Sequence, residues 1–310
     1  MQQVQAFIQA PEQEANDLLN SMVFALLAAV DEITPYNARH TKNMVYYAEN
    51  FLAWLESTGE NANLPIESKD AFIMCIRLHD VGKIAVPGEI MDKDSRLGTR
   101  IKAIQERFRV IELLCKLREE RGEMTKQEHI ETTAHLAKAL DDIAFFNKKP
   151  LITDADVAQI EGIAKRTYVD EDYQRQPWLN HTEVEALKIR RGTLTPAERE
   201  TIEKHVLETE FILSKVKFPY EYRKVPIWAK KHHEFLDGSG YPNHLLAENI
   251  PPEVRLLTIL DIFEALTAED RPYKHGMSAP KALKILHKMA NDGKLDQDIL
   301  QLFERSAAWE

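Results

Sequence analysis

The stretch KKHHEFLDGSGYP, residues 230–242, places two histidines side by side and follows them with an acidic, glycine-spaced turn. Adjacent residues on a helix point about 100° apart, so His232 and His233 are poorly placed to serve one helix face. Their divergent directions become useful at a helix end that faces a pair of metal ions. The stretch therefore indicates a ligand-bearing helix end, followed by a sharp turn that Tyr241 and Pro242 close.

The rest of the chain favours helices as well. Only 11 of the 310 residues are glycine, and apolar residues recur at helical spacing almost everywhere. Strand alternation and internal repeats are not evident, so we predict an all-α helical bundle. The expected helices cover 14–31, 35–57, 68–82, 98–121, 125–147, 154–167, 195–216, 222–235, 251–268 and 279–290.

The middle of the chain has a different pattern. From Arg96 to about Lys149 it is charge-rich, with a narrow apolar stripe at 101, 104, 108, 111 and 115 and then at 136, 140, 143 and 146. That spacing predicts an antiparallel helical hairpin, and we expect 168–186 to form an acidic loop that returns to the main body. We therefore divide the chain into an N-terminal helix at 1–30, a main domain at 31–91 and 187–310, and a helical insertion at 92–186.

Composition limits the partners. The 50 acidic residues exceed the 40 basic ones, and a net charge of −10 argues against binding to a nucleic acid polymer. The apolar run MVFALLAAV has nine residues, too few to span a bilayer, and no basic region precedes it. Two cysteines make a disulfide framework improbable. We expect a cytoplasmic protein without a membrane partner, in which metal ions would attract any anionic ligand.

Histidines and aspartates are the candidate ligands. His79 and Asp80 end an apolar helix, and Asp261 lies inside the apolar run VRLLTILDIFEAL. A buried aspartate is costly unless it is paired or bound to a cation, and no arginine or lysine shares the apolar face of Asp261. Seven candidates are more than one ion can use, which points to two ions sharing a carboxylate, and their chemistry favours transition metals. They are His40, His79, Asp80, His205, His232, His233 and Asp261.

Several motifs carry a family resemblance. RLHDVGKIAVP at 77–87, HHEFLDGSGYP at 232–242 and ILDIFEALTAEDRPYK at 259–274 resemble, in that order, the HD-GYP branch of the HD-domain phosphohydrolase superfamily. The segment IRRGTLTPAERETIEKH at 189–205 is similar to the stretch before the third-motif histidine of that family. The resemblance covers about 30–90 and 187–305. It implies an HD-domain bundle that hydrolyses cyclic di-GMP to 5′-pGpG, or onward to GMP, with metal-activated hydroxide.

The resemblance also implies roles for individual residues. All seven candidates become metal ligands, with Asp80 as the bridge between two ions. Some relatives hold a third metal through a glutamate four residues before the first histidine, where this chain has Tyr36, so two ions are expected. Iron or manganese is favoured, and nickel, cobalt and zinc also accept these ligands. Asp80 and Lys83 are the expected catalytic residues; the expected substrate-binding residues are Lys83, Asp237, Gly238, Tyr241, Arg271 and Lys274.

Some alternatives stay open at this point. Lys83 could be a solvated lysine at a helix end, Arg271 could pair with a nearby aspartate, and Tyr241 could only anchor its loop. The substrate could be cyclic GMP-AMP, or the domain could bind cyclic di-GMP without turnover. An HD nucleotide triphosphohydrolase would leave HHEFLDGSGYP and DRPYK unexplained. The insertion could be a solvated arm, a lid, or a contact with a second copy or another protein.

Overall fold

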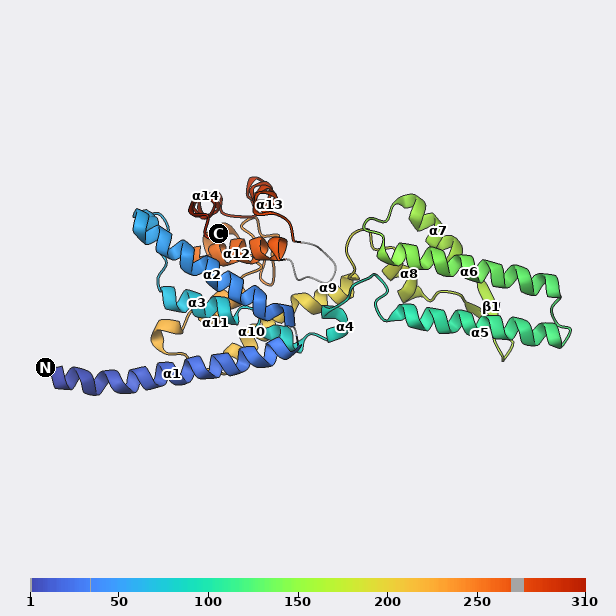
Figure 1. Ribbon diagram of the computed structural model, residues 1–310, viewed down its shortest axis with the longest axis horizontal. Coiled ribbons are helices and arrows are strands. Elements are labelled where there is room, and N and C mark those ends of the chain that lie inside the picture. Colours follow the sequence, from blue (N-terminus) through green and yellow to red (C-terminus); the bar gives the residue numbers. More distant parts are fainter. Residues whose placement is uncertain (1, 34, 269–275) are drawn as a thin grey trace. The chain divides into compact units, whose positions relative to one another are not determined.

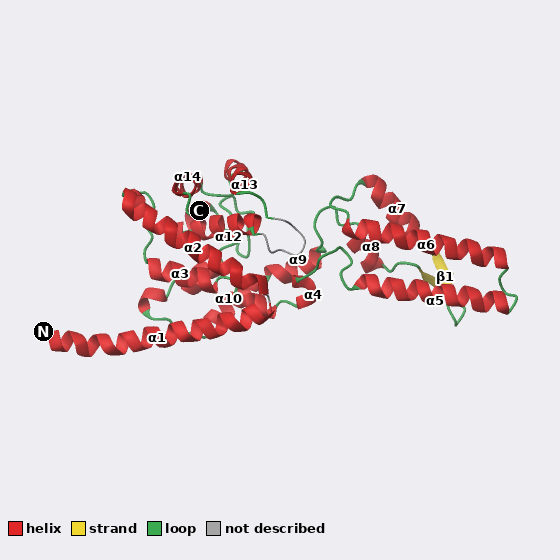
Figure 2. Ribbon diagram, viewed as in Figure 1, coloured by secondary structure: helices red, strands yellow, loops and turns green. Residues whose placement is uncertain are grey.

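Helices form nearly all the regular structure of the protein (Figures 1 and 2). The computed structural model describes residues 2–33, 35–268 and 276–310. Its contacts define two compact units, Met1–Pro87 with Thr201–Glu310, and Gly88–Glu200. The predicted all-α class is confirmed. The second unit contains the expected insertion at 92–186 and extends beyond it at both ends.

The first unit surrounds one apolar helix. Its helices are α1 (Gln2–Ile33), α2 (Pro35–Thr58), α3 (Lys69–Leu78), α10 (His205–Leu213), α11 (Val225–Lys230), α12 (Pro252–Thr267), α13 (Ala279–Asn291) and α14 (Gln297–Ser306). Short 3-10 turns join them: η1 (Glu60–Ala62), η2 (Val81–Ala85), η3 (Tyr220–Tyr222) and η4 (Ala247–Asn249). Helix α12 is apolar on most sides and packs against α2, α13 and α14, as expected of a core helix. Phe263 of α12 lies edge-on to Tyr47 and Phe303 in this core.

The HDVGK segment is a turn instead of the end of a longer helix. Ser68 caps α3 by accepting a hydrogen bond from the Ala71 amide, and the helix ends at Leu78, short of the predicted residue 82. The chain then forms η2, which lies against α10. A Cβ atom on Gly82 would lie 2.0 Å from the His205 carbonyl oxygen, so only glycine permits this contact. The turn therefore brings the His79-Asp80 pair to the start of α10.

Three predicted segments differ from the structure. The helix expected at 195–216 is two helices, α9 (Pro196–Glu203) and α10, which separate at Lys204. The helix expected at 222–235 ends at Lys230, so His232 and His233 lie in the turn that follows α11. The expected loop at 168–186 contains a small hairpin and the start of a helix whose N-terminus Asn180 caps. Helix α14, which Asp296 caps, is a further element that the sequence pattern did not predict.

The second unit contains the predicted helical hairpin. Its elements are α4 (Gly88–Met91), α5 (Arg100–Glu120), α6 (Lys126–Lys148), α7 (Asp154–Ala164), β1 (Thr167–Val169), β2 (Arg175–Pro177) and α8 (His181–Leu187). Helices α5 and α6 lie side by side (Figure 1). The buried residues of α5 are Ile104, Phe108, Ile111 and Cys115, the stripe expected from their spacing. Strands β1 and β2 pair antiparallel, with Tyr168 opposite Gln176.

No helix in the described ranges combines the length and the apolar composition needed to cross a bilayer.

An ion-pair cluster lies inside the second unit. Glu198 accepts hydrogen bonds from Lys93 Nζ at 2.6 Å and from the Thr195 amide at 2.8 Å, and it pairs with Arg100 at 2.9 Å. Burial opposes a charge on Glu198, but these partners outweigh it and lower its pKa from 4.5 to about 2. The side chain of Lys93 is only 2% exposed, so the carboxylate of Glu198 neutralises a buried ammonium group.

Replacing Glu198 with glutamine is expected to destabilise the second unit by about 3 kcal/mol at neutral pH, because Lys93 keeps its charge and loses its partner. The folded-state pKa of Glu198 is lowered, so its contribution is complete above pH 4.5 and is lost as the pH falls toward 2. Thermal melts at a series of pH values should show that the difference in melting temperature between wild type and Glu198→Gln shrinks as the pH falls below 4.5. A difference in melting temperature that stays the same in acid would contradict this expectation. So would an equal loss of stability in Glu171→Gln, the control at an exposed glutamate.

Candidate metal centre

The first unit brings all seven predicted ligands together. They come from α2 (His40), the end of α3 (His79 and Asp80), the first residue of α10 (His205), the turn after α11 (His232 and His233) and α12 (Asp261). The side chain of His233 is the most exposed of them at 25%, and the other six residues are buried. Among the seven residues, the side chain of His233 is therefore the one most accessible to solvent.

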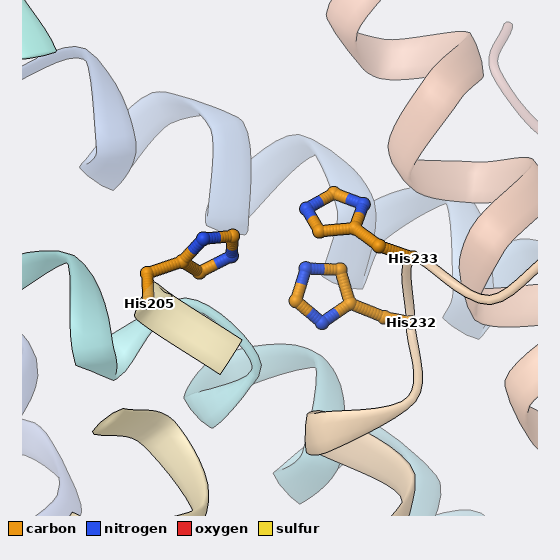
Figure 3. Close-up of side chains that lie close together, drawn as sticks. All are labelled: His205, His232 and His233. Carbon is orange, nitrogen blue, oxygen red and sulfur yellow. The ribbon is translucent and has the colours of Figure 1, made fainter. Parts of the chain in front are cut away.

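The candidate ligand atoms form three groups of three, and the group of His79, Asp80 and His232 connects the other two. His40, His79 and Asp261 form the first group, in which the atoms lie within 4.8 Å of one another. His205, His232 and His233 form the second group under the same limit, and Figure 3 shows His205 facing the other two rings. We call these the His40 trio and the His205 trio.

Asp80 lies between the two trios. Its Oδ2 atom is 3.2 Å from His79 Nε2 and 3.8 Å from His40 Nε2. Its Oδ1 atom is 3.3 Å from His205 Nε2 and 3.8 Å from His232 Nε2. Each carboxylate oxygen thus faces one trio, which is the arrangement that a carboxylate bridging two metal ions requires.

Backbone carbonyls fix the orientation of three imidazoles. In His79, His205 and His232, Nδ1 lies 2.7, 2.6 and 2.6 Å from the carbonyl oxygen three residues earlier. A carbonyl only accepts hydrogen bonds, so each Nδ1 carries a hydrogen, and in the neutral ring Nε2 keeps its lone pair. All three Nε2 atoms therefore have the form that binds a metal ion.

The protonation states of His232, His233 and Asp80 suit a bound cation. Burial holds the pKa of His232 well below its ordinary value and lowers the pKa of His233 to about 3, so both stay neutral. Burial favours a neutral Asp80, but His79, Lys83 and His205 outweigh it and keep the Asp80 pKa well below its usual range. For His40, burial is outweighed by hydrogen bonds to Asp261 and Glu264, which raise its pKa to about 9. A metal ion would have to displace that proton.

Buried polar atoms without a hydrogen bond test directly whether these residues fit a metal ion. Asp80 Oδ1, His205 Nε2 and His232 Nε2 are buried and form no hydrogen bond within the described part of the chain. Buried polar atoms without a hydrogen bond are costly, and these three belong to the His205 trio and to Asp80 between the trios. Imidazole nitrogens and carboxylate oxygens are the donors that first-row transition metals accept. The residues therefore fit a pair of such ions.

Lys83 lies at the same centre. Its Nζ forms an ion pair with Asp80 Oδ2, and its side chain is 19% exposed while that of Asp80 is 3% exposed. The turn that carries it is tied to α10 through Thr209, whose Oγ1 accepts from the Gly82 amide at 2.9 Å and donates to the His79 carbonyl at 3.1 Å. Lys83 is thus a partly solvated cation beside the bridging carboxylate.

The loop DGSGYP folds back onto the two histidines. The Tyr241 amide donates to the His233 carbonyl at 3.1 Å, and the two rings lie 4.8 Å apart. A Cβ atom on Gly240 would lie 2.3 Å from the Phe235 nitrogen and 2.4 Å from the His233 oxygen, so glycine is required there. This contact places Tyr241 beside the exposed histidine of the centre.

The other predicted substrate residues have different placements. Asp237 Oδ1 accepts from the amide and the hydroxyl of Ser239, at 2.9 and 2.7 Å, which closes the turn and lowers the Asp237 pKa. Gly238 has a φ of 76°, in the left-handed region that favours glycine. These two residues shape the loop. Arg271 and Lys274 lie outside the described residues.

Two buried glutamates near the centre were not predicted from the sequence. Glu234 accepts from the Asn243 amide at 2.6 Å and the Leu245 amide at 2.9 Å, which holds the loop in place. Glu264 lies 2.5 Å from His40 Nδ1. The cost of a buried acid, which singled out Asp261, applies equally to Glu264 three residues later, and that signal could have identified it.

This helical core, with histidines and aspartates gathered around a central carboxylate, is the arrangement of an HD domain whose side chains could hold metal ions. The family model for the HD domain matches residues 182–299. The chain is 34% identical over 127 residues to a 3′3′-cGAMP-specific phosphodiesterase of Vibrio cholerae, covering 41% of this chain and 28% of the relative. Over these residues the chain is similar to the HD domain, and through the motifs HDVGK and HHEFLDGSGYP it resembles the HD-GYP branch.

Two further relatives are named for a different substrate. A cyclic di-GMP phosphodiesterase response regulator of Xanthomonas campestris is 45% identical over 67 residues, covering 22% of this chain and 17% of the relative. A cyclic di-GMP phosphodiesterase of Thermotoga maritima is 35% identical over 104 residues, covering 34% and 27%. The matched segments thus span less than a third of each of these relatives.

Proposed function

We propose that the protein is a metal-dependent phosphodiesterase that hydrolyses cyclic di-GMP to 5′-pGpG, and onward to GMP. The observation that carries this proposal is the position of Asp80, with one oxygen toward each trio. The proposed ligands are the seven residues of the cluster, and iron or manganese are the proposed ions, with nickel, cobalt and zinc as further candidates. Relatives that are named as cyclic di-GMP phosphodiesterases support the choice of substrate.

The residues around the centre suit a phosphodiester. Two bound divalent ions supply an activated water and neutralise the charge of the phosphate. Asp80 holds both halves of the centre together, and Lys83 offers an ammonium group on its partly exposed side to a phosphate oxygen. Tyr241 offers a ring beside His233 on which a guanine base can stack. Asp237 and Gly238 shape that loop, and Arg271 and Lys274 stay proposed phosphate contacts.

A second substrate is favoured by a specific observation. Three of the relatives are named as 3′3′-cGAMP-specific phosphodiesterases, at 34%, 39% and 40% identity over 127, 97 and 87 residues. Both dinucleotides present the same phosphodiester to the metal centre and differ only in one base. The second candidate is therefore a phosphodiesterase for cyclic GMP-AMP with the same ligands and the same Lys83.

The test is hydrolysis of each cyclic dinucleotide by protein purified without oxygen and loaded with iron or manganese. The proposal expects linear 5′-pGpG from cyclic di-GMP, with a higher kcat/KM than for cyclic GMP-AMP. The reverse preference would select the second candidate. Nucleotide binding without any product, in protein that holds two metal ions, would overturn the proposed enzyme activity and leave a signalling module.

We also propose that the second unit pairs with a second copy of this chain. An apolar stripe on α5 is open to solvent, with Val110, Leu113 and Leu117 exposed by 44%, 62% and 40%. If two α5 helices pair antiparallel with the two-fold axis between Leu113 and Leu114, each Val110 faces the other Leu117, and each Glu106 faces the other Arg121. The stripe is therefore self-complementary in shape and charge, which a two-fold interface requires.

Replacing Leu113 with glutamate is expected to convert a dimer into a monomer, because it buries two like charges at the axis of the pair. Light scattering coupled to size exclusion, at tens of micromolar protein, measures the mass of each form. The control Ile285→Glu changes an exposed apolar residue of α13 and should stay dimeric. A monomeric wild type, or a Leu113→Glu protein of unchanged mass, would contradict the pairing.

A further inference from the structure

The four buried histidines of the centre do not have equivalent supports. Carbonyl oxygens accept from Nδ1 of His79, His205 and His232. At His40 the partner is a carboxylate instead, because Nδ1 lies 2.5 Å from Glu264 Oε2. A carboxylate withdraws the Nδ1 hydrogen more strongly than a carbonyl and makes the opposite nitrogen a more basic ligand.

Glu264 is itself rigidly held. It is 1% exposed, and its other oxygen, Oε1, accepts from Asn43 Nδ2 at 2.9 Å. Asn43 lies on α2, one helical turn after His40, so α2 supplies both the histidine and the residue that orients its partner. The pair is therefore fixed between two packed helices.

Helix α12 contacts the His40 ring at both nitrogens. Asp261 Oδ1 lies 3.4 Å from Nε2, and Glu264 Oε2 lies at Nδ1 on the other side of the ring. Asp261 and Glu264 are three residues apart and so share one face of α12. One helix therefore supplies a candidate ligand and sets the orientation of a second ligand from another helix.

We infer that Glu264 is a positioning residue that orients the His40 ring and strengthens the hold of the His40 trio on its metal ion. This inference rests on the proposed two-metal centre. Loss of a group that supports a metal-bound histidine typically weakens metal affinity by about 10–100-fold. Of the two metal ions bound by each chain, only one should bind more weakly, because Glu264 contacts His40 and the His205 trio has its own supports.

Titration of metal-free protein with manganese, in competition with a chromophoric chelator, resolves the two equivalents. In Glu264→Gln we expect the affinity of one equivalent to fall about 10–100-fold while the other keeps its wild-type value. Glu253→Gln is the matched control, because Glu253 is also a buried glutamate of α12 but accepts from the Glu67 amide, away from the centre. It should leave both equivalents unchanged.

Two more variants keep the test decisive. Asn43→Ala leaves Glu264 in place and removes its partner, and it should weaken the same equivalent by a smaller factor. His40→Ala should remove that equivalent, and adding Glu264→Gln to it should cause no further loss at the other one. Equal weakening of both equivalents, or of neither, would overturn the inference. A wild type that binds no manganese would instead overturn the proposed metal centre.

Discussion

Replacing Asp80 with alanine is expected to lower the rate of cyclic dinucleotide hydrolysis by on the order of 10³-fold or more, because both halves of the centre lose a shared ligand. The variant should also lose metal, since Oδ2 faces His79 and Oδ1 faces His205 at 3.2 and 3.3 Å. Elemental analysis of the purified protein should find fewer than two ions per chain. Rates and metal content should fall together.

The control for this change is Asp292→Asn, an exposed aspartate at the end of α13 in the same unit. It should keep the wild-type rate and metal content. Helical circular dichroism separates a lost centre from a lost fold in Asp80→Ala. A folded Asp80→Ala protein that retains two ions, or one that retains most of its activity, would show that Asp80 is not the bridge.

Replacing Gly82 with alanine is expected to lower the stability of the first unit by about 3 kcal/mol, because the new methyl group has no space. Its Cβ would lie 2.0 Å from the His205 carbonyl oxygen and 2.4 Å from the Thr209 amide nitrogen. Both neighbours are backbone atoms, so α10 must move away from η2. That movement separates His205 from Asp80, and metal affinity should fall along with the melting temperature.

Gly162→Ala is the matched control, because this exposed glycine lies inside α7 and a methyl group added to it would meet no atom within 4 Å. Alanine is the better helix former, so this change should stabilise the protein by about 0.5–1 kcal/mol. Thermal melts and manganese titrations of the two variants measure both effects. A Gly82→Ala protein with wild-type melting and wild-type metal affinity would contradict the close packing of η2 on α10.

Much of the site could be anticipated from local sequence. The cost of a buried aspartate singled out Asp261, and adjacent histidines near a helix end singled out His232 and His233. The structure brings these residues together with His40, His79, Asp80 and His205, although their role as ligands stays a proposal. Spacing along one helix can reveal such residues because it decides which side chains must be buried.

Other features depend on contacts between distant segments. The turn at HDVGK is set by the close approach of α10 to Gly82, and α10 lies more than a hundred residues later. The partnership of Glu264 with His40 joins residues 224 positions apart. Helix α11 ends at Lys230, and the backbone of His233 then meets the loop at Gly240. No local pattern encodes these tertiary contacts. The cost of burying an acid could have marked Glu264 in the sequence, but neither its partner His40 nor the exact helix ends could be predicted.

The central claim is that two metal ions lie on either side of Asp80. Anomalous scattering from crystals of manganese-loaded protein, measured near the manganese edge, tests it most directly. We predict two peaks in each chain, one against the His40 trio and one against the His205 trio, with a carboxylate oxygen of Asp80 next to each. A single peak, or a second peak away from Asp80, would contradict the account.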